Sequence, residues 1–205
     1  MRNPSPPMSK PTLDAPLSWA QTRELMRRDF ARYRPLMGEH VSLPKKIFWL
    51  LLPATLGLLA YRTYRYAYLR GWRNLANLMF LINRYVTGMD IPPSTSIGGG
   101  CLLGHGEVVL CGRIGENFTM MGHGGVGGGF NDDDVGAGPG LPVLGDNIVM
   151  AVRSIVLGAV RIGDGARLGP ACTVMRDVPP GAVVAAAPSR VMPMPQAANS
   201  AGGAD

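Results

Sequence analysis

The most constraining feature of this sequence is an apolar residue that recurs every six positions through its C-terminal half. Neither an α-helix, with a period of 3.6 residues, nor an alternating strand produces this spacing. A six-residue apolar repeat is typical of a parallel β-helix, in which each hexad forms one short strand and one turn. The in-phase positions are Leu144, Met150, Val156, Ile162, Leu168 and Val174. We therefore predict triangular coils that enclose these side chains and stack at about 4.8 Å.

The same count continues upstream of this repeat after a slip of one residue. The in-phase apolar positions there are Ile91, Ile97, Leu103 and Val109, then Ile114, Met120 and Val126. We expect the coils to span residues 89–192. Residues 127–143 (GGGFNDDDVGAGPGLPV) are glycine-rich, acidic and aperiodic, and they predict a loop that leaves one corner of the prism.

Residues 17–88 predict a helical N-terminal region, with disordered tails at residues 1–16 and 193–205. The stretch from Ser18 to Tyr33 has the pattern of an amphipathic helix capped by Ser18. The apolar stretch from Ile47 to Tyr61 is shorter than the roughly 20 residues that cross a bilayer. Tyr61 to Val86 mixes arginines and aromatic residues along a predicted helix. The predicted fold class is thus mainly β, a parallel β-helix preceded by helices.

Charge is divided unevenly along the chain. Residues 1–88 carry 14 Lys and Arg against 4 Asp and Glu, whereas residues 89–205 carry 6 against 10. The basic half indicates either a solvated helical surface or an anionic partner, such as a membrane surface contacted through residues 45–73. No aromatic-interleaved RNA motif or zinc-finger spacing is present, so we expect no nucleic-acid partner.

Three cysteines, Cys101, Cys111 and Cys172, form no CxxC motif and are odd in number. They predict small buried side chains in a reducing compartment rather than a disulfide framework. We expect a cytoplasmic protein, with peripheral contact to the inner membrane face as the alternative.

The residues that could carry chemistry are few. His105 lies two places after the inward Leu103, which places it at a corner and facing outward, and His123 follows 18 residues later, about one coil on. Asp90 stands where the coils begin. An imidazole oriented by a carboxylate is a general base suited to neutral pH, so His105 and Asp90 are candidate catalytic residues and His123 a second site histidine.

From about Gly88 to Met192 the chain resembles the serine acetyltransferase branch of the hexapeptide acyltransferases. In that family a DIHP segment is followed, fifteen residues after its Asp, by the His of LDHATG. Here Asp90-Ile91-Pro92 is followed fifteen residues later by His105 in Leu103-Gly104-His105-Gly106. Further matches are Val126-Gly127-Gly128-Gly129, Val156-Leu157-Gly158, Val178-Pro179-Pro180 and Ala186-Ala187-Pro188-Ser189-Arg190.

This resemblance implies a left-handed coil, a homotrimer, and acetyl-CoA bound as co-substrate between neighbouring subunits. It implies that His105 is the general base and that Asp90 holds its imidazole, as the carboxylate does in a hydrolase triad. Backbone N–H groups near Gly127 and Gly128 are the candidate oxyanion site. The candidate CoA contacts are Val152, at a corner along the coil, and Ser189 and Arg190 near the end of the coils.

Two departures from the family pattern concern the acceptor. Where the family has an Asp before the catalytic His this chain has Gly104, and where it has Arg-His before a Pro this chain has Gly140 and Leu141. A buried amino-acid headgroup is costly to bind without charge partners. Because short, basic N-terminal regions also occur in similar polysaccharide O-acetyltransferases, we expect an O-acetyltransferase acting on a sugar or polysaccharide-precursor hydroxyl.

Three other interpretations remain open at this point. The acceptor could be serine, as in cysteine biosynthesis, or the β-helix could be a non-catalytic scaffold. A zinc site of the carbonic-anhydrase type needs three histidines, whereas only His105 and His123 lie in the coils, so we expect no metal. The run Asp132-Asp133-Asp134 matches no calcium loop and predicts a solvated lid.

Overall fold

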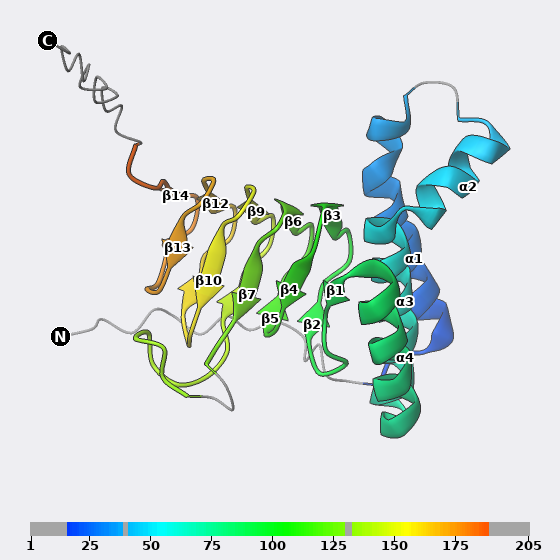
Figure 1. The fold of residues 1–205 in the computed structure, drawn as a ribbon, viewed down its shortest axis with the longest axis horizontal. Helices are drawn as coiled ribbons and strands as arrows, with labels where there is room; N and C mark the ends of the chain where they lie inside the picture. Colours follow the sequence, from blue (N-terminus) through cyan, green and yellow to red (C-terminus); the bar gives the residue numbers. More distant parts are fainter. Residues whose placement is uncertain (1–15, 39–40, 130–132, 189–205) are drawn as a thin grey trace, which may run out of the picture.

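The computed structural model describes residues 16–38, 41–129 and 133–188. It consists of a helical N-terminal part packed against one end of a prism of stacked strands (Figure 1). The segments predicted as disordered tails lie almost wholly outside the described residues.

The helical part contains four α-helices and one short 3-10 helix. They are α1 (Trp19–Tyr33), η1 (Arg34–Met37), α2 (Leu43–Leu51), α3 (Pro53–Leu69) and α4 (Arg73–Thr87). As predicted, Ser18 caps α1: its hydroxyl accepts from the Gln21 N–H, and the Gln21 side chain accepts from the Ser18 N–H. Among the described residues no single helix is long and apolar enough to cross a membrane, although α2 and α3 together meet that test across a 72° bend.

The single helix predicted from Tyr61 to Val86 is wrong. The chain leaves helical geometry after Leu69, and Gly71 takes a φ of +85°, a conformation that glycine adopts without a steric penalty. The chain therefore reverses, and α4 packs beside α3 (Figure 1). Within α3, Tyr61, Arg62, Tyr64 and Arg65 are buried, so this helix packs on the β-helix.

The predicted parallel β-helix is confirmed. Its strands form three sheets, in the orders β1-β4-β7-β10-β13, β2-β5-β8-β11 and β3-β6-β9-β12-β14, and every pairing is parallel. The strands are β1 (Met89–Asp90), β2 (Ser96–Ile97), β3 (Leu102–His105), β4 (Val108–Leu110), β5 (Arg113–Ile114), β6 (Thr119–Gly122), β7 (Gly125–Gly127), β8 (Val143–Leu144), β9 (Val149–Met150), β10 (Ile155–Leu157), β11 (Arg161–Ile162), β12 (Arg167–Leu168), β13 (Thr173–Val174) and β14 (Val183–Val184).

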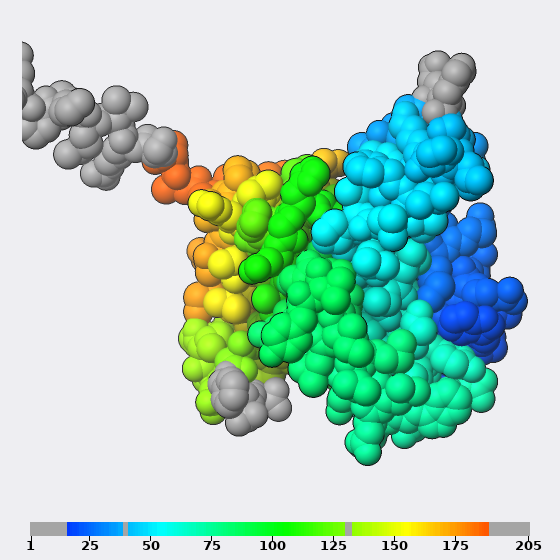
Figure 2. Space-filling model, turned by 45° about the vertical axis from the view of Figure 1, so that its right-hand side comes forward, coloured from blue at the N-terminus to red at the C-terminus, as the bar shows by residue number. Residues whose placement is uncertain are grey.

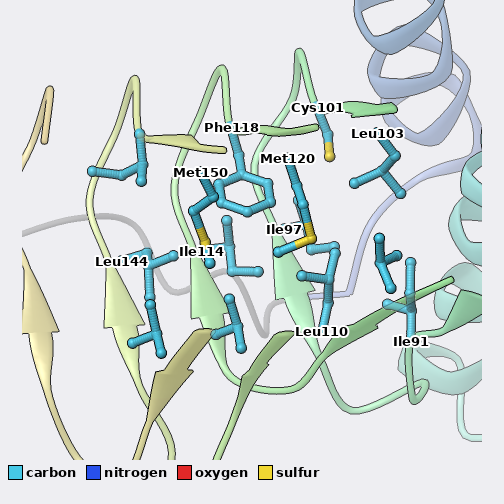
Figure 3. Close-up of a cluster of buried hydrophobic side chains, with 14 of the residues drawn as sticks. Ile91, Ile97, Cys101, Leu103, Leu110, Ile114, Phe118, Met120, Leu144 and Met150 are labelled. Atoms are coloured by element: carbon cyan, nitrogen blue, oxygen red, sulfur yellow. The ribbon is translucent and has the colours of Figure 1, made fainter. Parts of the chain in front are cut away.

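The hexad residues from Leu144 to Val174 are all buried, as their period predicts. Figure 3 shows five upstream members in the same interior, together with Cys101 and Phe118: Ile91, Ile97, Leu103, Ile114 and Met120. One inward assignment is wrong: Val109 is 44% exposed, and Leu110 is the buried residue that pairs with Val126. Leu103 and Leu110 are thus seven residues apart and Leu110 and Ile114 only four, so the turn that follows His105 holds one extra residue and the next corner is two residues short.

The interruption of the repeat lies between β7 and β8. Ile114 pairs with Leu144, thirty residues later, whereas Leu144 pairs with Ile162 after one ordinary coil of eighteen. The additional residues leave the prism at the end of β7 and return before β8 (Figure 1). The strand register on either side of the loop is thereby preserved.

The helices supply hydrogen-bond partners to the backbone groups at the open edge of the first coil. Asp29 of α1 and Arg62 of α3 form a buried ion pair, with Nε to Oδ2 at 2.7 Å. Arg62 also donates to the carbonyls of Ile97 and Gly98, and the Asp29 carboxylate accepts from the Cys101 N–H. The pair thus supplies partners to backbone groups that have no preceding coil to bind.

Three buried tyrosines extend the same contact. The hydroxyls of Tyr33, Tyr61 and Tyr64 donate to the carbonyls of Leu103, Thr95 and Ile91. Burial raises the pKa of each of these phenols, so the hydroxyls remain protonated donors.

We expect Asp29→Ala to lower the free energy of unfolding by about 3–5 kcal/mol, because it leaves the Arg62 guanidinium buried without its carboxylate. Glu24→Ala is the matched control on the same helix, since its ion pair with Arg27 is exposed and contributes little. Urea unfolding followed by circular dichroism at a fixed protein concentration measures both. Equal midpoints for the two variants would contradict the role given to the buried pair.

Candidate active site

His105 is the last residue of β3 and stands at a corner of the prism. Leu103 points into the core, and the chain turns at Gly106, whose φ is +80°. The imidazole is therefore exposed, as the repeat predicts. In the next coil Gly122 lies beside His105. In the coil after that, Val152 stands at the same corner, because the pairing of Met120 with Met150 puts Gly122 in register with Val152.

Asp90 ends β1, in the sheet that begins on the other side of this corner. Asp90 and His105 line one cavity of about 930 Å³ between the first coils and the helices. Within the described residues, the ion-pair partner of Asp90 is Arg84 of α4, with Nη2 to Oδ2 at 3.3 Å, and no hydrogen bond joins Asp90 to His105. The two predicted residues therefore share a site, while orientation of the imidazole by Asp90 stays a prediction.

The helical part supplies much of the cavity wall. The residues that line it from helices and their connections include Tyr33, Trp49, Leu52, Leu81, Arg84 and Tyr85. Glu107, in the turn after His105, adds a carboxylate. Sequence reasoning missed Arg84 and Glu107, because the coil repeat carries no information on which helix covers the first coil.

His123 lies close to His105, as the coil spacing suggested. It occupies the corner after β6 in the left-handed region, with a φ of +48°. Its imidazole rests against Gly106, so closely that a Cβ on Gly106 would overlap the ring. His123 therefore packs against the turn that follows His105.

The remaining predicted residues are spread along the coils. Gly127 ends β7 and Gly128 follows it, and neither residue lines the cavity of this chain. Val152 is 42% exposed at the His105 corner. Ser189 and Arg190 lie outside the described residues.

Backbone packing explains one departure in the motif. A Cβ on Gly104 would lie within 2.8 Å of the carbonyl carbon of Met121 and closer still to its oxygen. The neighbouring coil therefore leaves no room for a side chain at position 104 without a backbone shift.

The three cysteines, all among the described residues, do not have activated thiols. Burial raises the pKa of the half-buried Cys111 thiol, and the charge of Asp90 raises it further. Burial likewise raises the pKa of Cys101 and Cys172. A raised pKa disfavours the thiolate, so none of these three cysteines has the character of a catalytic nucleophile.

The acidic run in the loop between β7 and β8 does not resemble a metal centre. Among the described residues no group of three or more His, Cys, Asp or Glu side chains is placed to hold a metal ion. In the loop, Asp134 accepts from the N–H groups of Gly136 and Gly138, which is a turn-forming contact. Asp132 lies outside the described residues.

We expect Gly106→Ala to displace the His123 imidazole and to cost roughly 1–2 kcal/mol for the left-handed backbone. Gly181→Ala is the matched control, because Gly181 has a φ of +69° but nothing within 4 Å of an added Cβ. Thermal unfolding and the NMR signals of the imidazoles measure the two effects. Equal destabilisation with a changed His123 signal in Gly106→Ala alone is the expected result, and an unchanged signal would refute the contact.

Comparison with known proteins identifies the family of this chain. No family model matches the chain. A serine acetyltransferase of Helicobacter pylori is 32% identical over 146 residues, covering 70% of this chain and 83% of the relative. One from Mycobacterium tuberculosis is 31% identical over 143 residues, covering 68% of this chain, which spans only 61% of that relative's length.

Solved structures give the same result. Soybean serine acetyltransferase in complex with serine superposes with a TM-score of 0.71 at 28% identity, over 84% of this chain and 70% of that one. The Neisseria gonorrhoeae enzyme in complex with serine, at 24% identity, has a TM-score of 0.68 over 84% of this chain and 69% of that one. The expected likeness to polysaccharide O-acetyltransferases stays a prediction.

The helical region, the β-helix and the identity over most of the Helicobacter relative lead to one conclusion: this chain belongs to the serine acetyltransferase family of hexapeptide-repeat enzymes, and is an acetyl-CoA-dependent O-acetyltransferase.

Proposed function

We propose that this enzyme transfers the acetyl group of acetyl-CoA to the hydroxyl of serine. This acceptor replaces the sugar hydroxyl expected from the sequence, because the relatives at 31–32% identity are named serine acetyltransferases. The observation that carries the proposal is the cavity itself, in which His105 and Asp90 lie with two further charges of opposite sign, Arg84 and Glu107.

His105 accounts for the proton transfers of the reaction. Its imidazole accepts the proton of the acceptor hydroxyl as the oxygen attacks the thioester carbon. When the tetrahedral intermediate collapses, the C–S bond breaks and the imidazolium returns the proton to the CoA thiolate. Asp90 is the positioning carboxylate, although in the free chain it pairs with Arg84.

Arg84 and Glu107 suit a zwitterionic acceptor. A buried amino-acid headgroup needs a cation for its carboxylate and an anion for its ammonium group. Arg84 supplies the first and Glu107 the second, both from the wall of the His105 cavity. They would take over the task that family members assign to residues at positions 104 and 140–141.

A homotrimer with acetyl-CoA between subunits is part of the proposal. The coil surface around His105 exposes Val109, Met121 and Val152, each at least 42% accessible. Apolar side chains gathered around a catalytic corner are typical of a surface that another subunit or a ligand covers. In such an assembly Gly127, Gly128, Ser189 and Arg190 are candidates to contact acetyl-CoA across the subunit boundary.

A sugar or polysaccharide-precursor hydroxyl is the second candidate acceptor. Two observations favour it: the backbone contact that excludes a side chain at Gly104, and a cavity of about 930 Å³, large for one amino acid. A scaffold without catalysis is the outcome expected if His105 proves dispensable.

We expect His105→Asn to reduce acetyl transfer by roughly 10²–10⁴-fold, because it removes the general base while keeping a similar shape. Thiol release from acetyl-CoA measures the rate, and circular dichroism checks that the coils remain folded. His123→Asn is the comparison variant at the neighbouring corner, expected to lose less. Undiminished turnover by the His105 variant would refute its catalytic role.

Arg84→Met is expected to raise the KM for serine about tenfold or more while leaving the KM for acetyl-CoA nearly unchanged, because the acceptor carboxylate loses its partner. The variant also removes the ion pair of Asp90, which acts on kcat rather than on the KM for acetyl-CoA. Arg23→Met, on the exposed face of α1, is the control. Wild-type enzyme is assayed in parallel with serine, nucleotide sugars and lipid-linked sugars. Turnover with a sugar and none with serine would overturn the serine proposal in favour of the second candidate.

A further inference from the structure

The helix α2 has an unusual position for its composition. Its sequence, LPKKIFWLL, is mostly apolar, yet none of its residues is buried. The most exposed apolar side chains are Leu43 at 71%, Phe48 at 60% and Leu51 at 64%, with Ile47 beside them. Figure 2 shows α2 (cyan) along the upper edge of the helical part. An apolar surface of this kind on one short helix indicates a partner.

The charge around α2 defines the chemistry of that partner. Residues 41–88, which contain α2, α3 and α4, have seven Lys and Arg and no Asp or Glu. Lys45 and Lys46 are exposed on α2 itself, next to Ile47 and Phe48. Lysines that flank exposed Phe, Leu and Trp on one helix are the pattern of an interfacial helix on anionic lipid.

The structure reduces the part of residues 45–73 that is accessible to a membrane. Much of α3 is unavailable, because Tyr61, Arg62, Tyr64 and Arg65 are buried against the first coil. Within residues 45–73 the exposed apolar surface is therefore mainly α2, together with Trp72. The helix α4 also exposes apolar side chains, such as Ile82 and Tyr85, but it carries no lysine. A symmetric contact between the α2 helices of two copies fits this surface less well, because it would bring two basic regions without acidic residues against each other.

We propose that α2 docks the enzyme on an anionic bilayer, with Leu43, Ile47, Phe48 and Leu51 entering the headgroup region and Lys45 and Lys46 contacting lipid phosphates. This inference does not depend on the identity of the acceptor. Trp49 and Leu52, adjacent to these residues, line the His105 cavity, so docking holds the cavity beside the membrane surface.

Vesicle co-sedimentation of the full-length chain tests the proposal. Vesicles of phosphatidylcholine alone are compared with vesicles containing about one third phosphatidylglycerol. We expect binding to the anionic vesicles, weak binding to the neutral ones, and loss of binding as salt rises from about 0.1 M to about 0.5 M.

Two variants separate the apolar and ionic contributions. Phe48→Ser with Leu51→Ser is expected to weaken binding roughly tenfold or more, through lost apolar burial. Lys45→Glu with Lys46→Glu is expected to abolish the preference for anionic vesicles. Val183→Ser is the control, because Val183 is 71% exposed on β14, far from the helices. None of these residues lines the cavity, so thiol release with a soluble acceptor should be unchanged, which separates this proposal from the proposed function.

Three results would overturn the inference. The wild-type chain could fail to bind anionic vesicles, or Val183→Ser could lose binding as strongly as the α2 variants. Alternatively, sedimentation velocity without lipid could reveal a larger assembly that the Phe48 and Leu51 substitutions split, which would identify α2 as a contact between copies of the chain.

Discussion

The structure depends on how the open edge of the first coil is satisfied. Every later coil binds the backbone groups of the one before it, whereas the first has no such neighbour. Asp29 and Arg62 meet this need with a buried ion pair whose remaining hydrogen bonds go to the Ile97 and Gly98 carbonyls and the Cys101 N–H. A buried pair is costly to form, but it is costlier to break, so the two helices that carry it are held on the coil in one arrangement.

That arrangement also creates the active site. Because α1 and α3 are fixed on the first coil, α4 and the start of α3 lie over the corner that carries His105. Arg84 then reaches Asp90, and the connection between α2 and α3 closes one side of the cavity. Asp90 and His105 from two strands, Glu107 from a turn and Arg84 from a helix thus line one cavity at the boundary between the two parts of the chain, a common location for small-molecule sites.

Irregularities in the repeat position the chemistry. The extra residue between Leu103 and Leu110 lengthens the turn after His105, and it leaves Val109 outside and Leu110 inside. His123 then packs on Gly106, because both stand at the same corner in successive coils. Farther along, the coils from Leu144 to Val174 keep the regular count of six without an insertion or a deletion.

The sequence alone determined the β-helix, its inward hexads, the capped first helix and the pair His105 and Asp90, because period and motif spacing are local properties of the chain. It misplaced Val109, since a slip within one turn leaves several apolar neighbours equally suited to the interior. It also merged α3 and α4, because no proline separates them and Gly71 acts through its backbone conformation. The positions of Arg84 and Glu107 in the cavity wall, the burial of α3 and the exposure of α2 were decided only by tertiary structure. They depend on which helix faces pack against the first coil. That packing is set by contacts between residues far apart in the chain, such as Asp29, Arg62 and Ile97, and no local sequence pattern encodes such contacts.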